Sequence, residues 1–328
     1  MARILYYLLL RPLSLLPLSM LYPLSGGVCF LLYRLGFRRK VVLENLRKSF
    51  PERSAPEIRA LALRFYRHFS DLLIEGIRMF GISREELLLR MRVVNPQLLN
   101  PLYDAGKNVF VVIGHYNNWE YLAAALDAQI KHRGAALYTP LSNAFFNTKW
   151  SEARGRHGLL LVSKHNSHSF ITKRHPEPIA LVMGADQSPT FSKHVHWTTF
   201  LGQDTAVMLG TEVYARRYGF AVVFAHVKKI ARGYYEATFS LLEDHAAAAA
   251  EGAITERHVR ALEADILRDP EVPYRVPERG YLALGDNSFN SSDSRAWGTA
   301  PQENLMGPGL FVYWPFLRDP QTRFGLIK

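Results

Sequence analysis

Two residues in the first half of the chain have the types and spacing that proton-transfer chemistry uses. His115 stands just after an apolar run, and Glu120 follows five positions later. An imidazole titrates near neutral pH, and a carboxylate on one ring nitrogen fixes the tautomer and raises the basicity of the other. A polar turn in which Glu120 only caps a helix has the same spacing. The pair therefore predicts a general base if the local fold brings the two side chains together.

The segment around His115 has the pattern of a strand that turns into a helix. Residues 109–113 are apolar and mostly β-branched, which predicts a buried strand that ends at Gly114. Asn117 and Asn118 are residue types that cap helices, so a helix is predicted from Trp119 to about residue 130. His115 would then sit on a strand-to-helix turn, where a rigidly held side chain can contact a ligand.

The same alternation continues through the middle of the chain and predicts an α/β layer architecture. The predicted strands are 109–113, 135–139, 159–162, 179–183, 220–227 and 234–242. The predicted helices are 119–130, 143–156, 167–174, 206–218 and 255–268. Before them, residues 41–92 have the apolar spacing of two or three amphipathic helices.

The first 40 residues predict a membrane anchor. Residues 12–33 carry no charge, and as a helix they would be about 33 Å long, enough to cross a hydrocarbon core. Because prolines and a Gly-Gly pair interrupt the run, a kinked span or a membrane hairpin is predicted equally with a simple span. A cleaved signal peptide is the alternative. The apolar run is followed by a cluster of basic residues, Arg34, Arg38, Arg39 and Lys40. Such a cluster predicts that the bulk of the protein lies in the cytoplasm.

Composition narrows the classes of partner. A hydrophobic content of 48% excludes a disordered protein, and the formal net charge of +11 favours an anionic partner. Without a zinc-finger, RNA-binding or helix-turn-helix pattern, nucleic acid is not the predicted partner. The single cysteine, Cys29, rules out an internal disulfide. No spacing of His, Cys and Asp predicts a metal site, and no cofactor is predicted.

The segment from Gly114 to Glu120 resembles the His-x4-Asp/Glu block of the lysophospholipid acyltransferase superfamily, and specifically of the lipid A biosynthesis (lauroyl/myristoyl) acyltransferase family. Further blocks of that family are matched in order at 45–51, 153–158, 184–189 and 199–202. The similarity runs from about residue 1 to Pro270. It implies a glycerol-3-phosphate-acyltransferase-like layered sheet with flanking helices and an N-terminal membrane-anchoring helix. The chain would divide into an anchor (1–40), an acyltransferase domain (41–271) and a remainder (272–328).

The resemblance also implies an activity and a location. A membrane-bound enzyme on the cytoplasmic side of the bacterial inner membrane would move a fatty acyl chain from acyl carrier protein to a hydroxyl of a lipid A precursor or related glycolipid. His115 would take the hydroxyl proton, oriented by Glu120, and Arg154 would contact the oxyanion or a donor phosphate. The further candidates for substrate binding are Asp186, Gln187 and Lys193. Attack would be direct, because no Ser or Cys stands in a nucleophile-elbow context.

The plainer interpretations of these residues stay open. Arg154 has the pattern of a solvated helix charge, and Asp186 that of a residue that caps a turn. The neighbouring enzyme alternative is acylation of another glycolipid or a lysophospholipid. An inactive lipid-binding scaffold is an alternative of a different class.

Residues 272–328 depart from the acyltransferase pattern. Over about 50 residues they resemble the final box of bacterial type I signal peptidases, with the key positions Gly285, Asp286, Asn287, Ser291, Asp293 and Arg295. By that resemblance Ser291 would position a lysine base and Asp293 would pair with Arg295. The nucleophile box and the lysine of those peptidases have no match. We therefore predict an inactive, small β-rich appendage, with a degenerate signal-peptidase-like membrane protein as the alternative function.

Overall fold

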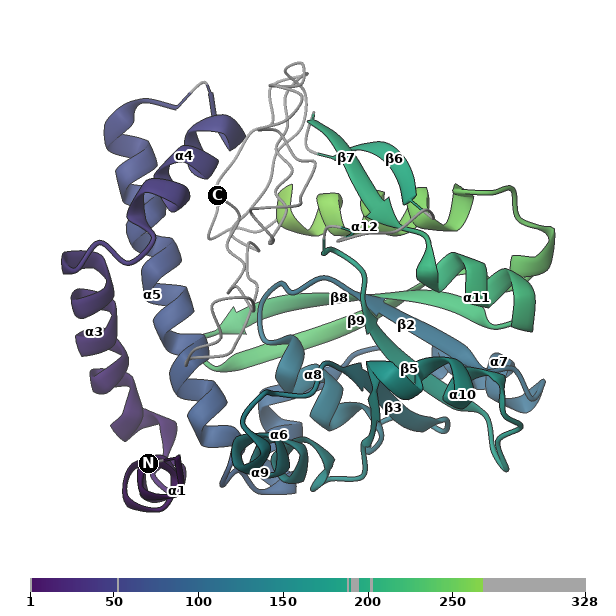
Figure 1. The fold of residues 1–328 in the computed structure, drawn as a ribbon, viewed down its shortest axis with the longest axis horizontal. Helices are drawn as coiled ribbons and strands as arrows, with labels where there is room; N and C mark the ends of the chain where they lie inside the picture. Colours follow the sequence, from purple (N-terminus) through teal and green to yellow (C-terminus); the bar gives the residue numbers. More distant parts are fainter. Residues whose placement is uncertain (1, 52, 188, 190–194, 201–202, 268–328) are drawn as a thin grey trace.

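A seven-stranded mixed sheet lies at the centre of the computed structural model, which describes residues 2–51, 53–187, 189, 195–200 and 203–267 (Figure 1). The strand order is β1-β9-β8-β2-β5-β3-β4, parallel throughout except for the antiparallel β8–β9 pair. The strands are β1 (Met91–Val93), β2 (Val109–Ile113), β3 (Arg133–Tyr138), β4 (Leu160–Ser163), β5 (Ile179–Gly184), β8 (Ala221–Ala231) and β9 (Tyr234–Glu243). A separate hairpin pairs β6 (Val195–Phe200) with β7 (Gln203–Met208).

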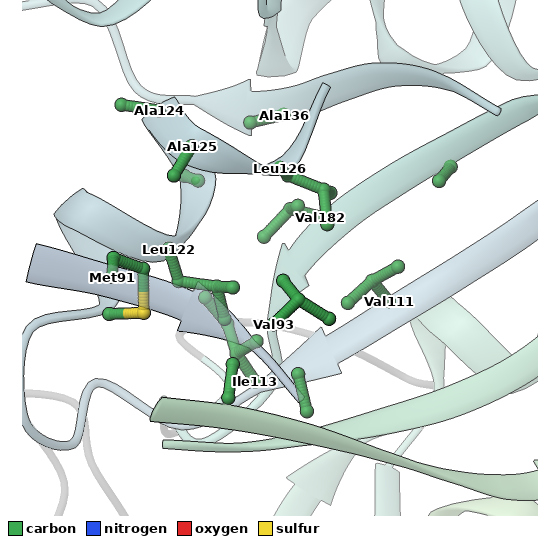
Figure 2. Close-up of a cluster of buried hydrophobic side chains, with 14 of the residues drawn as sticks. Met91, Val93, Val111, Ile113, Leu122, Ala124, Ala125, Leu126, Ala136 and Val182 are labelled. Atoms are coloured by element: carbon green, nitrogen blue, oxygen red, sulfur yellow. The ribbon is translucent and has the colours of Figure 1, made fainter. Parts of the chain in front are cut away.

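Strand β2 is buried on both faces, as its run of apolar residues predicts. Its odd-numbered residues enter one core, where Val111 and Ile113 meet Leu122 and Leu126 of helix α8 (Trp119–Leu126) (Figure 2). Phe110 and Val112 enter a second core on the opposite face. That face is covered by α10 (Ser167–Thr172), α11 (Gly210–Tyr218) and α12 (Ala253–Leu267). The strand is therefore fixed from both sides, and so is the turn that follows it.

The N-terminal quarter is helical and packs beside the sheet through one long helix, α5 (Ala55–Met79) (Figure 1). A capping box begins α5, with the Ser54 side chain and the Glu57 carboxylate each binding the other's backbone N–H. The helices before it are α1 (Ala2–Leu5), the π-helical turn Tyr6–Leu10, α2 (Arg11–Leu13), α3 (Leu18–Arg34) and α4 (Arg39–Ser49). Among the helices that the structure describes, none alone has the length and hydropathy of a membrane span. The segments Leu18–Arg34 and Arg39–Lys48, bent by 86°, meet those criteria only as a pair.

Most of the predicted elements are confirmed to within a few residues. All six predicted strands are present, within a mixed α/β sheet that has helices on both faces. The prediction of a helix over 206–218 is wrong at its start, because Gln203–Met208 pair with β6 and the helix begins at Gly210. Strands β1, β6 and β7 were not predicted. Helices α6 (Arg84–Arg90), α7 (Asn100–Asp104) and α9 (Ala144–Gly155) complete the layer around α8.

Candidate active site

The turn between β2 and α8 holds His115 at the carboxyl edge of the sheet. Asn117 adopts a left-handed conformation (φ 52°), and its side-chain amide donates to the Val227 carbonyl of β8 at 2.8 Å. Asn118 accepts a hydrogen bond from the Tyr121 backbone N–H at 2.9 Å, which caps α8. A side chain at Gly114 would collide with Leu262 of α12, since an added Cβ would lie 2.4 Å from its Cδ1. The turn is thus fixed to two neighbouring elements.

The imidazole of His115 is bound to Asp186. The Nδ1 atom lies 2.6 Å from Asp186 Oδ1, and the His115 backbone N–H donates to Asp186 Oδ2 at 2.7 Å. Because an ionised carboxylate only accepts hydrogen bonds, Nδ1 carries the proton and Nε2 is the basic nitrogen. Burial raises the pKa of Asp186, but the charge and hydrogen bonds of His115 outweigh it, so the pKa lies below its usual value. The two residues form a base and the carboxylate that orients it.

Parallel pairing of two strands brings this pair together across 71 positions of sequence. Ile113 is opposite Gly184 in the β2–β5 register, and the Ala185 N–H continues the pairing by donating to the Ile113 carbonyl. His115 and Asp186 each come two residues after these partners. Gly184 also makes room for the ring, because an added Cβ would lie 2.6 Å from His115 Cε1.

The predicted pairing of Glu120 with His115 is corrected by the structure. Both Glu120 oxygens bind the Arg154 guanidinium of α9, with Nε donating to Oε2 at 2.7 Å and Nη2 to Oε1. Glu120 lies in the first turn of α8, and its side chain points to α9. The imidazole Nδ1 is already bound to Asp186. The side chains of Glu120 and Arg154 are only 10% and 14% exposed, so this is a largely buried ion pair.

Trp119 lies next to both the His115–Asp186 hydrogen bond and the Glu120–Arg154 ion pair. Its ring meets the His115 ring edge to face with centroids 4.9 Å apart, and the Arg154 guanidinium lies 5.7 Å from its centroid. Trp150 of α9 also lies near this guanidinium, which is 5.4 Å from the Trp150 ring centroid. The two indoles therefore limit where Arg154 can move, and one of them also packs on the imidazole.

Helix α12 supports the loop that carries Asp186. His258 is buried and donates to the Ala185 carbonyl. Burial lowers its pKa to about 4, against the opposing charges of Asp186 and Glu212, so the ring is neutral at pH 7. Glu212 of α11 in turn accepts from the backbone N–H groups of Gly252 and Thr255 at the start of α12, at 2.5 and 2.8 Å.

A buried carboxylate beneath the turn escaped the sequence analysis. Glu75 of α5 accepts hydrogen bonds from Asn118 Nδ2 (2.7 Å), Tyr235 (2.9 Å) and Tyr22 (3.0 Å). Burial raises its pKa to about 7, although the three hydrogen bonds act in the opposite direction. An acidic residue within the apolar pattern of a helix was the available signal, because such a carboxyl needs internal partners. It joins the N-terminal helices to the cap of α8.

The other predicted positions are less informative. Gln187 follows Asp186 and is half-buried. Lys193 lies outside the described residues, as do Gly285, Asp286, Asn287, Ser291, Asp293 and Arg295. Within the part of the chain that the structure describes, no three His, Cys, Asp or Glu side chains are grouped as a metal site would require.

Comparison with known proteins gives two family matches, which overlap at residues 236–273. A family model described as bacterial lipid A biosynthesis acyltransferase matches residues 1–273, and one described as signal peptidase, peptidase S26, matches 236–314. The probable signal peptidase I-2 of Synechocystis sp. is 48% identical over 46 residues, 14% of this chain and 21% of its own length. The signal peptidase I of Aquifex aeolicus is 46% identical over 43 residues, 13% of this chain and 17% of its own length. The chain thus spans about a fifth of the length of the curated relatives it matches.

Proposed function

We propose, because this chain belongs to the bacterial lipid A biosynthesis acyltransferase family, that it moves a fatty acyl chain from acyl carrier protein to a hydroxyl of a lipid A precursor. The family supports an acyltransferase role; the donor and the acceptor are our proposal. The observation that carries the proposal is the 2.6 Å contact between His115 Nδ1 and Asp186 Oδ1 at the carboxyl edge of the sheet.

In the proposed reaction His115 Nε2 accepts the proton of the acceptor hydroxyl while its oxygen attacks the thioester carbonyl. The carbon–oxygen bond forms, the carbon–sulfur bond breaks, and the proton passes from the imidazolium to the departing thiolate. Asp186 stabilises the imidazolium and holds the ring, as the aspartate does in a Ser-His-Asp triad. Both substrates are present together in this scheme, and no acyl-enzyme forms at His115.

For Glu120 and Arg154 we propose a positioning role. Their ion pair joins α8 to α9 and keeps Trp119 against the imidazole. The family resemblance implies that Arg154 contacts the oxyanion or a donor phosphate. Its guanidinium would then bind that group while it is also hydrogen-bonded to Glu120. Gln187 and Lys193 stay candidates for substrate contact.

We further propose that the N-terminal helices lie against the cytoplasmic face of the bacterial inner membrane. Large apolar side chains are exposed along residues 4–37, among them Leu8 (76%) and Leu35 (74%). Arg34, Arg38 and Arg39 come at the end of this apolar surface, where they would meet anionic headgroups. An amphipathic surface of this kind binds the boundary between headgroups and acyl chains.

The test of the proposed function compares His115→Ala with the unaltered protein, both purified in detergent. Transfer of a labelled acyl chain from acyl carrier protein to a lipid A precursor is expected to fall by about 10²–10⁴-fold. Glu152→Gln is the matched control, because Glu152 forms an exposed ion pair with Lys149 on α9. Mass spectrometry of lipid A from cells with and without the gene tests the acceptor. Unchanged transfer by His115→Ala would overturn the base assignment, and unchanged lipid A would point to another glycolipid or a lysophospholipid.

We do not propose peptidase activity. The matched peptidase relatives align with only 13–14% of this chain, in a region that falls largely outside the described residues. An appendage without the peptidase nucleophile, as the sequence predicts, is the interpretation that we retain.

A further inference from the structure

A second group of chemically complementary side chains lies on the β8–β9 hairpin under α12. His226 Nδ1 lies 2.6 Å from Asp265 Oδ1, and His226 Nε2 lies 2.8 Å from Ser240 Oγ. His226 is on β8, Ser240 on β9 and Asp265 on α12. Carboxylate, imidazole and hydroxyl are therefore in the order in which serine hydrolases use them.

Strand pairing explains how the three residues meet. In the antiparallel register Phe224 is opposite Ser240 and His226 is opposite Thr238. His226 and Ser240 are therefore diagonal neighbours on the same face of the hairpin. Helix α12 packs across that face and brings Asp265 to Nδ1 of the His226 ring. No sequence motif predicts this group, because Ser240 is on a strand and not on a nucleophile elbow.

The hydrogen bonds also fix the direction of proton transfer. The Asp265 carboxylate accepts from Nδ1, which leaves Nε2 to accept the hydroxyl proton of Ser240. The side chains of His226 and Asp265 are 27% and 19% exposed, and Ser240 is half-buried. The three side chains are therefore packed but partly exposed.

This group lies beyond the end of β2, as His115 does. Phe224 is opposite Val112 of β2, so His226 is two residues past that pair and His115 is three residues past it. The next residue of β8, Val227, accepts the Asn117 hydrogen bond that holds the His115 turn. Two histidine centres, His115 and His226, therefore come after the last paired residues of β2 and β8.

We propose that Ser240 is the nucleophile of a separate site that hydrolyses acyl thioesters or esters. Ser240 Oγ attacks the acyl carbonyl as His226 takes its proton, the bond to the leaving group breaks, and His226 protonates that group. Water then attacks the acyl-serine and loses its proton to His226. The bond from the carbonyl carbon to Ser240 Oγ breaks as His226 passes that proton to Oγ, and the fatty acid leaves with Ser240 restored. The choice of an acyl substrate rests on the proposed function, whereas the nucleophile rests on the geometry alone. Thr238, on the same face two residues away, offers a hydroxyl donor for the oxyanion.

The experiment labels the full-length protein in detergent with a fluorophosphonate, which forms a bond from serine oxygen to phosphorus as fluoride leaves. Tryptic peptide 233–257 contains Ser240 as its only serine, and fragmentation of the labelled peptide distinguishes Ser240 from its Tyr and Thr hydroxyls. We expect label on this peptide, none in Ser240→Ala, and at least about tenfold slower labelling in His226→Gln and Asp265→Asn. Ser169→Ala is the control, because Ser169 is exposed and bonds only locally to the Asn166 carbonyl at 3.0 Å.

A second variant guards against a folding defect. In Ser240→Cys the new thiol should react readily with iodoacetamide, and the additional change His226→Gln should slow that reaction, with buried Cys29 as the slow internal reference. Hydrolysis of p-nitrophenyl butyrate should follow the same order of variants. Absence of label at Ser240, or labelling that does not depend on His226, would overturn the proposal and leave a purely structural network. None of these readouts involves acyl transfer at His115, so the two proposals fail separately.

Discussion

Asp186 holds His115 by two hydrogen bonds, one to the ring at 2.6 Å and one to the backbone N–H at 2.7 Å. The carboxylate therefore fixes both the position of the residue and the orientation of its imidazole. The two residues follow adjacent parallel strands that are buried on both faces, so the geometry of the pair is set by the sheet. A base held in this way needs little reorganisation when it accepts a proton.

Replacing this carboxylate should cost activity without unfolding the protein. Asp186→Asn keeps the side-chain shape but removes the charge that stabilises the imidazolium, so kcat for acyl transfer should fall by about 10²–10⁴-fold. Glu120→Gln should lower kcat by less than about tenfold, because the orienting carboxylate of His115 is untouched. The pH dependence of kcat distinguishes them, since only Asp186→Asn should shift the ionisation assigned to the base. Equal losses in the two variants would contradict this assignment.

The Glu120–Arg154 ion pair should instead show its importance in stability. Glu120→Ala leaves the largely buried guanidinium of Arg154, which lies near two indoles, without its carboxylate. This should cost about 3 kcal/mol in the free energy of unfolding. Glu152→Ala, at the exposed pair with Lys149, should change that free energy by less than about 1 kcal/mol. Urea unfolding of both variants measures the difference. A double-mutant cycle with Arg154→Met gives the coupling energy, and a coupling near zero would show that the pair is not stabilising.

The elements around the site were predictable from local pattern. The apolar run 109–113, Gly114 and the capping Asn118 each specify their own conformation, and the strand and helix form where those signals stand. The β7 segment was misassigned because its pattern is too short to separate a strand from a helix, and its partner β6 decides the outcome.

The partners within the site were not predictable in the same way. Glu120 is close to His115 in sequence, yet the acid that binds the imidazole comes 71 residues later. The parallel register of β2 and β5 brings Asp186 there, and register is a property of the whole sheet. Glu75 and the Ser240–His226–Asp265 group depend on α5 and α12 docking, which no local pattern encodes.

Glu75 should make stability depend on pH. Its pKa is about 7 in the folded protein against 4.5 in an unfolded chain, so the folded state binds the proton more tightly. The contribution of Glu75 to stability is then highest below pH 4.5 and decreases as the pH rises toward about 7, by an amount on the order of 3 kcal/mol, with no further change above. Glu75→Gln cannot ionise and should lack this slope. His258 has a pKa of about 4 in the folded protein, so its contribution to stability decreases as the pH falls from 6.5. The quantity to compare is therefore the difference in unfolding free energy between Glu75→Gln and the unaltered protein at each pH. Urea unfolding from pH 5 to 8 measures it, and parallel curves would show that Glu75 does not titrate in this range.

Gly184 offers a way to displace the imidazole without changing any charge. An alanine Cβ there would lie 2.6 Å from His115 Cε1 and 3.2 Å from Nε2, so the ring must move or the strand must shift. A displacement near 1 Å in a catalytic group costs about 10²-fold in rate, and Gly184→Ala should lose activity on that scale. Gly210→Ala is the matched control, because nothing lies within 4 Å of a Cβ at that position, and its rate should stay within about twofold. The measurement is kcat for acyl transfer, with a thermal melt to verify that both variants are folded. A Gly184→Ala enzyme of unaltered rate would mean that the active imidazole does not occupy the position beside β5, and the base would have to be sought elsewhere.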